Sequence, residues 1–134
     1  MIEAWGITDK GAVRAENQDC YYLKLHGDDL AAAIVCDGMG GHRAGNVASA
    51  LAVDVASAYL ESLTDAELAQ VPGEHLTRSV NLANDAVFRR SNQEPDYAGM
   101  GTTMVSVIVA GPVVHILNIG DSRAYRISAG GIEK

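Results

Sequence analysis

Apolar runs of strand length stand at both ends of this chain, with two helical patterns between them. The runs are rich in Val, Ile, Leu and aromatic residues, and turn signals such as Gly27-Asp28-Asp29 separate them, as is typical of short strands. We expect strands at residues 2–8, 20–25, 30–36, 102–110, 113–119 and 122–127. Strands that flank a block of helices predict an α+β layered fold with antiparallel sheets.

The middle of the chain has helical periodicity. Apolar residues recur every three or four positions over residues 44–63, which predicts a long helix. The stretch from Thr64 to Glu67 has the form of a capping box, in which two backbone amides at a helix start are satisfied, so a short helix can begin there. Pro72-Gly73 would end that short helix, and a second long helix is expected over residues 74–91.

Bulk composition restricts the partners and the compartment. The 134 residues carry 10 Lys+Arg and 17 Asp+Glu, a formal net charge of −7, which argues against nucleic acid because such binding needs a basic surface. The most apolar stretch, residues 104–119, is broken by polar residues, Gly and Pro, so we expect no membrane span. The first residues lack the features of a secretory signal. Cys20 and Cys36 form no Cys-x-x-Cys pair, so we expect free thiols and a cytoplasmic protein.

Three aspartates stand at the ends of apolar runs. Asp19 precedes one run, Asp37 follows another, and Asp121 follows a third. Their sequence neighbours are glycine, amide or arginine residues, with no lysine close by in the sequence to neutralise them. Several uncompensated carboxylates at one place need a divalent cation, and oxygen ligands favour Mg²⁺ or Mn²⁺. The pattern predicts a metal-dependent hydrolase that acts on phosphate.

The glycine-rich stretch of residues 37–42 has several interpretations. A dinucleotide-binding fingerprint would need a third glycine where Arg43 stands. The spacing between Cys36 and Arg43 is one residue too long for a cysteine-dependent phosphatase loop. A metal-binding turn, with the carboxylate of Asp37 and a close backbone carbonyl at Gly38, stays open beside a plain strand-to-helix turn, for which one or two glycines suffice. The aspartates of the two other motifs favour the metal-binding turn.

Four motifs together carry a family resemblance. They are Arg14-x-x-Asn17-Gln18-Asp19, Asp37-Gly38-Met39-Gly40-Gly41-His42, Gly101-Thr102-Thr103 and Gly120-Asp121-Ser122-Arg123. In order and spacing they resemble bacterial metal-dependent serine/threonine protein phosphatases of type 2C, the PPM family, over essentially the whole chain. The resemblance implies an αββα sandwich of antiparallel sheets flanked by helices. It also implies two Mn²⁺ or Mg²⁺ ions in a cleft at one sheet edge, and phosphoprotein substrates of a cognate serine/threonine kinase.

The resemblance implies a role for each site residue. Asp37 would bridge the two metal ions, and the carbonyl of Gly38 would bind one of them. Asp19 matches an acidic residue that holds the metals directly or through water, and Asp121 matches a carboxylate at a third, weaker metal. Arg14 would clamp the substrate phosphate, because a guanidinium offers two parallel donors; the alternative is a solvated surface arginine. Arg14 and Asp37 are therefore the expected catalytic residues.

Two positions depart from the family pattern. Gln18 stands where many members carry glutamate, which removes one negative charge near the metals. His42 lies five residues after Asp37, whereas the histidine of animal relatives lies closer to its aspartate. The general-acid role proposed for that histidine is therefore not carried over, and a histidine flanking the helix start at residue 44 is an equal interpretation of His42.

Length is the largest departure. The resemblance implies that residues 1–134 are the N-terminal portion of a single catalytic domain, incomplete on its C-terminal side, without the later Asp-Gly turn and Asp-Asn pair that complete the metal site. Such a portion leaves sheet edges open, and open edges pair with other chains, so we expect a homo-oligomer. Two hypotheses follow: part of a working phosphatase, or a non-catalytic regulatory or protein-binding module that keeps the fold.

Overall fold

Residues 1–40 and 44–134 are described by a computed structural model, in which an antiparallel hairpin comes first. Strand β1 (Asp19–Leu25) pairs with strand β2 (Leu30–Met39). The later elements are α1 (Ala44–Glu61), α2 (Asp65–Ala69), α3 (Pro72–Gln93), the 3₁₀ turn η1 (Pro95–Tyr97), β3 (Gly101–Thr102), β4 (Met104–Ala110), β5 (Val113–Ile119), β6 (Arg126–Ser128) and β7 (Gly131–Glu133). The larger sheet has the order β1-β2-β4-β5, with β3 paired to the end of β2.

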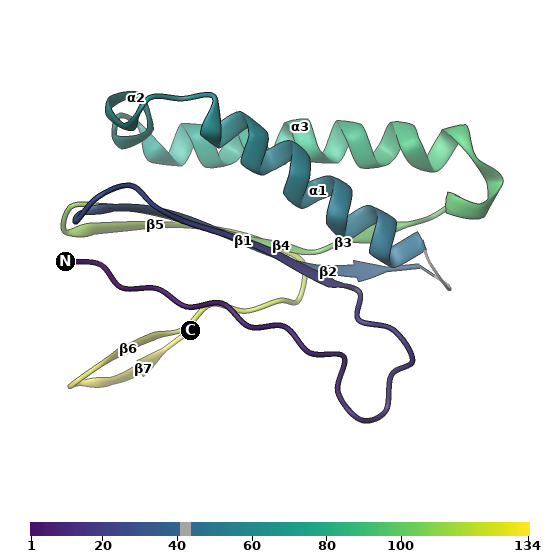
Figure 1. Cartoon of the computed structure of the whole chain (residues 1–134), viewed down its shortest axis with the longest axis horizontal. Coiled ribbons are helices and arrows are strands. Elements are labelled where there is room, and N and C mark those ends of the chain that lie inside the picture. The colour runs from purple at the N-terminus through teal and green to yellow at the C-terminus, as the bar shows by residue number, and fades with distance from the viewer. Residues whose placement is uncertain (41–43) are drawn as a thin grey trace.

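The helices and the larger sheet form two layers. Figure 1 shows α1 and α3 side by side on one face of this sheet, and the N-terminal segment and the β6–β7 hairpin on its other side. All strand pairs are antiparallel. The predicted α+β class is confirmed, and one helical layer and the adjoining sheet of the expected sandwich are visible.

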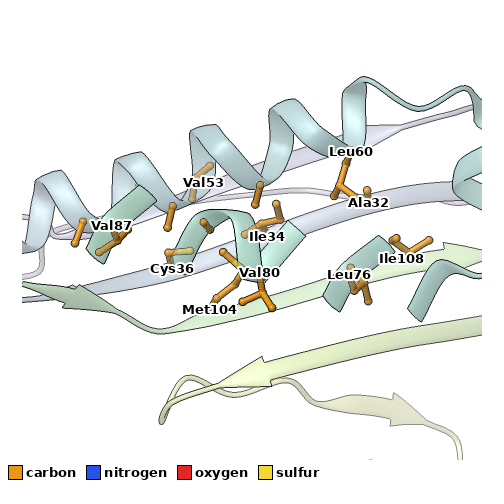
Figure 2. Packing of buried hydrophobic residues seen from close by; sticks show 14 of the residues in the cluster. Ala32, Ile34, Cys36, Val53, Leu60, Leu76, Val80, Val87, Met104 and Ile108 are labelled. Atoms are coloured by element: carbon orange, nitrogen blue, oxygen red, sulfur yellow. The ribbon is translucent and has the colours of Figure 1, made fainter. Parts of the chain in front are cut away.

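The core lies between the sheet and the two long helices. Alternate residues of β2, including Ala32, Ile34 and Cys36, are fully buried beneath the helices (Figure 2). Ala48, Ala52 and Ala56 recur every four residues on the buried side of α1, and such small side chains let a helix approach the strands closely. Helices α1 and α3 pack against each other and complete this core.

The helix predictions are confirmed, with small changes at the ends. The capping box is present, because Thr64 Oγ1 accepts from Glu67 N and Glu67 Oε1 accepts from Thr64 N, both at 3.1 Å. Helix α3 begins at Pro72, two residues before its predicted start. Proline suits the first helical position because the amide it lacks would have no partner there. Val71, at φ 44°, turns the chain into α3.

The strand predicted at residues 2–8 is wrong, because this segment forms no strand in the described chain. A Cβ added at Gly6 would lie 2.4 Å from a ring carbon of Tyr21. The segment therefore rests on the face of β1 rather than along its edge, where backbone pairing would occur. One backbone hydrogen bond, from Ile2 N to Asp28 O at 2.9 Å, holds its start.

The strand predicted at residues 122–127 is largely wrong as well. Only residues 126–128 form β6, and their partner is β7 rather than a strand of the larger sheet. The chain turns away after β5 at Gly120, whose φ of 98° suits a residue without a side chain. The strand predicted at 102–110 is divided into β3 and β4 at Thr103. No helix within the described ranges is long and apolar enough to cross a membrane.

One buried hydroxyl provides a test of the core. Ser106 on β4 is fully buried, and its Oγ finds no hydrogen-bond partner among the described residues. Leaving a buried hydroxyl unpaired is costly, so Ser106→Ala should stabilise the chain by about 1 kcal/mol in urea unfolding. Ser79→Ala is the matched control, because Ser79 is equally buried but donates to Leu76 O at 2.7 Å. A stabilisation as large in the control would contradict the explanation.

Candidate metal centre

Two carboxylates stand directly opposite each other on β1 and β2. Asp19 pairs with Asp37 in the strand register. Backbone hydrogen bonds from Gly38 N to Gln18 O, at 3.0 Å, and from His26 N to Leu30 O show which opposite residues of this hairpin are hydrogen-bonded to each other. Hydrogen-bonded and non-hydrogen-bonded pairs alternate, so Asp19 and Asp37 form a non-hydrogen-bonded pair, the kind in which side chains come closest together. The backbone thus holds two acidic groups side by side.

This crowding changes the acidity of Asp37. Its pKa is raised above the ordinary value, first by desolvation, then by a hydrogen bond to Asp19 and by the negative charges of Asp19 and Asp121. The positive charge of Arg14 opposes these effects. Where burial and neighbouring carboxylates disfavour the charged form of a carboxyl group, a bound cation can take the place of its proton.

The three predicted aspartates line one cleft of about 810 Å³, together with Arg14 and Gly38. Asp121 follows β5 and the Gly120 turn. Among residues 1–40 and 44–134, no three or more His, Cys, Asp or Glu side chains are close enough to hold a metal ion. The described part of the chain therefore offers a close carboxylate pair and a third carboxylate farther away.

Asp37 does not follow a strand, as the sequence suggested, but lies within one. Strand β2 continues to Met39 because β3 pairs with its end, with Gly38 opposite Thr102 and Met39 opposite Gly101. The sequence did not predict this end of β2, because the glycines at positions 38, 40 and 41 are typical of a turn. Gly40 also lines the cleft, whereas Gly41 and His42 lie outside the described residues, so the interpretation of His42 stays a prediction.

Gly38 has a steric reason to be glycine. It is buried where α1 meets β2, and a Cβ there would lie 2.0 Å from the backbone oxygen of Gly45. A Cβ at Gly45 would in turn lie 2.5 Å from Gln18 Oε1. These close approaches bring the first turn of α1, the end of β2 and Gln18 together beneath the cleft. The metal-binding role of the Gly38 carbonyl stays a prediction.

Arg14 belongs to a loop that side-chain hydrogen bonds hold in place. Asn17 Nδ2 donates to Thr8 Oγ1 at 2.6 Å, and Asn17 Oδ1 accepts from Asp19 N at 3.0 Å. Glu16 Oε2 accepts from Asn46 Nδ2 of α1 at 3.1 Å. The loop is thus tied to the N-terminal segment, to β1 and to α1, and it carries Arg14 to the cleft. The role of Arg14 in phosphate binding stays a prediction.

Sequence reasoning missed three contributors to this site. Lys10 lines the cleft, so a lysine does lie near the carboxylates in space although not in the sequence. Asn17 and Thr103 belong to the sequence motifs but had no predicted role, and each accepts a hydrogen bond from the backbone amide of an aspartate. The spacing of two residues between Asn17 and Asp19 was a usable signal, because Asn commonly accepts from the backbone amide two residues on. No local sequence signal predicts the contact between Thr103 and Asp37, because the two residues are 66 positions apart.

The described chain combines an antiparallel sheet, two packed helices on one face of that sheet, and an acidic cleft lined by Asp19, Asp37 and Asp121. Residues 11–133 match the family Protein phosphatase 2C, and the chain belongs to this family. It is 40% identical over 118 residues to the serine/threonine phosphatase Stp of Listeria monocytogenes, covering 88% of this chain and 47% of that relative. The chain thus spans about half the length of the curated relatives of this kind that it matches.

Solved structures agree with this placement. Stp1 from Staphylococcus aureus superposes with a TM-score of 0.87 at 35% identity, covering 99% of this chain and 52% of that one. The catalytic domain of the phosphatase PstP, solved in complex with two manganese ions, gives a TM-score of 0.76 at 36% identity, covering 94% and 51%. The expected family and fold are therefore confirmed, and the chain covers about half of each of these two solved chains.

The surroundings of Asp37 predict that its charge, which a metal ion would need, lowers the stability of the metal-free fold. Because the folded pKa of Asp37 is raised, its protonated form is favoured in the fold, and that stability is lost as the pH rises through the folded pKa. With EDTA at pH 7, Asp37→Asn should therefore raise the free energy of unfolding, by less than about 1 kcal/mol because solvent screens the exposed side chain.

The gain should shrink as the pH is lowered toward about 4, where an ordinary aspartate becomes protonated. Urea unfolding at several pH values measures this dependence. Asp85→Asn, on the exposed side of α3 and outside the cleft, is the control. A destabilised Asp37→Asn chain at neutral pH would contradict the electrostatic explanation.

Proposed function

We propose that the protein containing this chain hydrolyses phosphoserine and phosphothreonine in proteins, with Mn²⁺ or Mg²⁺ as cofactor. The observation that carries the proposal is the Asp19–Asp37 pair, held in direct register in a cleft that Arg14 also lines. Membership of the Protein phosphatase 2C family supports it, as do relatives named serine/threonine phosphatases. Each of the four motifs that suggested the family contributes at least one residue to the lining of this cleft.

The donor set fits hard divalent cations. The described lining of the cleft offers carboxylate and backbone oxygens, and it contains no cysteine or histidine. Asp37 with the Gly38 carbonyl would hold two ions, Asp19 would hold them directly or through water, and Asp121 would serve a third. The two manganese ions of PstP support this number for the main site. When bound, such ions supply a nucleophile at neutral pH and stabilise developing charge on phosphate oxygens.

The cationic side chains have the complementary task of holding substrate. Arg14 would bind two phosphate oxygens through its guanidinium and fix the phosphorus for in-line attack. Lys10, also at the cleft, adds a second positive charge for a phosphate dianion. In the reaction a water oxygen forms a bond to phosphorus and gives up a proton, the ester bond breaks, and the serine or threonine oxygen leaves and takes up a proton.

Other parts of the proposal concern the whole protein. Residues 1–134 would be the N-terminal portion of a single catalytic domain, which accords with their coverage of about half of each related structure. Its substrates would be phosphoproteins made by a cognate serine/threonine kinase. We place it in the cytoplasm, because Cys20 and Cys36 are free thiols on the helix-covered side of the sheet.

Activity measurements test the proposal. In the protein that contains this chain, hydrolysis of a phosphothreonine peptide should require Mn²⁺ or Mg²⁺ and stop on addition of EDTA. Asp37→Asn should lower kcat by several orders of magnitude, because a cation ligand is lost. Arg14→Ala should mainly raise KM, by about tenfold or more, because charge-assisted hydrogen bonds to phosphate are lost. Near-normal turnover of Asp37→Asn with Mn²⁺ would refute the assignment.

We also propose that the 134-residue chain self-associates through its sheet. Strand β5 is an edge of the larger sheet, and Val114 and Ile116 on it are 55% and 53% exposed. Side chains alternate along β5, and Leu117 packs against the core beneath the helices. Val114 and Ile116 therefore share the opposite face of the sheet. An apolar edge strand is a template for pairing with the same strand of a second copy.

Light scattering during size-exclusion chromatography tests this association. The chain should run as a dimer at tens of micromolar or above, and Ile116→Lys should make it a monomer, because edge lysines oppose strand pairing. Phe88→Lys is the control, since Phe88 is 65% exposed on α3 rather than on the sheet. A wild-type monomer at every concentration would refute the association.

A further inference from the structure

Thr103 lies between the two parts of the chain that carry Asp37 and Asp121. It is 2% exposed and sits between β3 and β4. Its Oγ1 accepts from Asp37 N at 3.0 Å and lies 2.5 Å from Ser122 Oγ. Its own backbone N donates to Asp37 O at 2.9 Å. One residue thus holds both backbone polar groups of Asp37 and also contacts the residue after Asp121.

The hydroxyl of Thr103 can satisfy both contacts at once. The Asp37 amide can only donate, so it occupies one lone pair of Thr103 Oγ1. A hydroxyl has one proton and a second lone pair, and either can join it to Ser122 Oγ. The chain Asp37 N–Thr103 Oγ1–Ser122 Oγ is therefore a continuous hydrogen-bonded link across sequence separations of 66 and 19 residues.

The turn that carries Asp121 is fixed on the same residue in two more ways. Asn118 Nδ2 donates to Ser122 O at 3.0 Å, which closes the turn between the end of β5 and Ser122. A Cβ added at Gly120 would lie 2.7 Å from Cγ2 of Thr103, so the turn packs directly on the threonine methyl group. Movement of Thr103 would therefore be passed to the Asp121 turn as well as to Asp37.

We propose that Thr103 is a positioning residue that sets the spacing between Asp37 and Asp121, and so between the divalent cations that these two residues would hold. Its hydroxyl holds the backbone of Asp37 and, through Ser122, the turn that carries Asp121. The inference rests on the proposed metal-dependent function, and it adds Thr103 and Ser122 to the residues on which cation affinity depends. Threonine suits the position because the hydroxyl makes the link while the methyl group supports the turn.

Substitutions at the link separate positioning from simple packing. Thr103→Val keeps the shape of the side chain but removes the hydroxyl, and Ser122→Ala removes the other end of the link. Groups that orient metal ligands typically change metal affinity 10–100-fold, so each variant should weaken Mn²⁺ binding by about tenfold. Thr103→Ser should stay within about threefold, because it restores the hydroxyl. The double variant Thr103→Val with Ser122→Ala should bind as Thr103→Val does, because both changes break one link.

Mn²⁺ affinity is measured on the full chain from the free-ion signal in electron paramagnetic resonance, at a temperature where thermal unfolding shows every variant folded. Thr77→Val is the matched control, since Thr77 Oγ1 donates to Gly73 O on the exposed part of α3, far from the cleft. Affinity unchanged in Thr103→Val, with only a lower melting temperature, would overturn the proposal, because that result is expected of a packing role.

A metal-free measurement separates this inference from the proposed function. In ¹⁵N-resolved spectra of the chain, Thr103→Val should speed hydrogen exchange of the Asp37 amide, and Ser122→Ala should shift the same resonance. If both effects occur but the wild-type chain binds no Mn²⁺, the coupling stands and the cation-positioning role of Thr103 is refuted for this chain, whereas the activity measurements above decide the proposed function. If Ser122→Ala leaves the Asp37 amide unchanged, the coupling itself is refuted, whatever the chain does with Mn²⁺.

Discussion

The pairing of Asp19 with Asp37 across β1 and β2 is the contact on which the rest of this site depends. Like charges placed directly opposite in a sheet repel each other, so the backbone register has to hold them there. That register is fixed from the other face, where Ile34 and Cys36 are fully buried beneath the helices. A slip of β2 by one residue would turn Asp37 toward the core and its apolar residues toward the cleft.

The helical layer therefore acts on the site from a distance. Alanines along α1 let the helix approach β2 closely, and Gly38 and Gly45 let its first turn touch the strand end. The resulting core can offset the unfavourable crowding of carboxylates in the cleft. Functional sites commonly keep such destabilising arrangements, and the surrounding fold supplies the stability they lack. The raised pKa of Asp37 is the local sign of this arrangement.

The sequence predictions succeeded where an element depends on neighbouring residues and failed where it depends on distant ones. The helices and the capping box at Thr64 were predicted closely, because their periodicity and caps lie within a few residues. Residues 2–8 looked like a strand, yet a strand exists only where a partner offers its edge, and this segment lies on the face of β1 instead. The end of β2 looked like a turn, because its pairing with β3 depends on residues far along the chain.

The sequence by itself determined the α+β class, the family and the acidic residues at which cation chemistry was predicted, since these follow from periodicity and from motifs of a few residues. The tertiary structure decided that Asp19 and Asp37 stand face to face, that Asp121 shares their cleft, and that Lys10 lines it too. It also decided that Thr103 links Asp37 to Ser122. Hydrogen bonds and charge contacts between residues tens of positions apart exist only after the strands have paired, so no local pattern contains them.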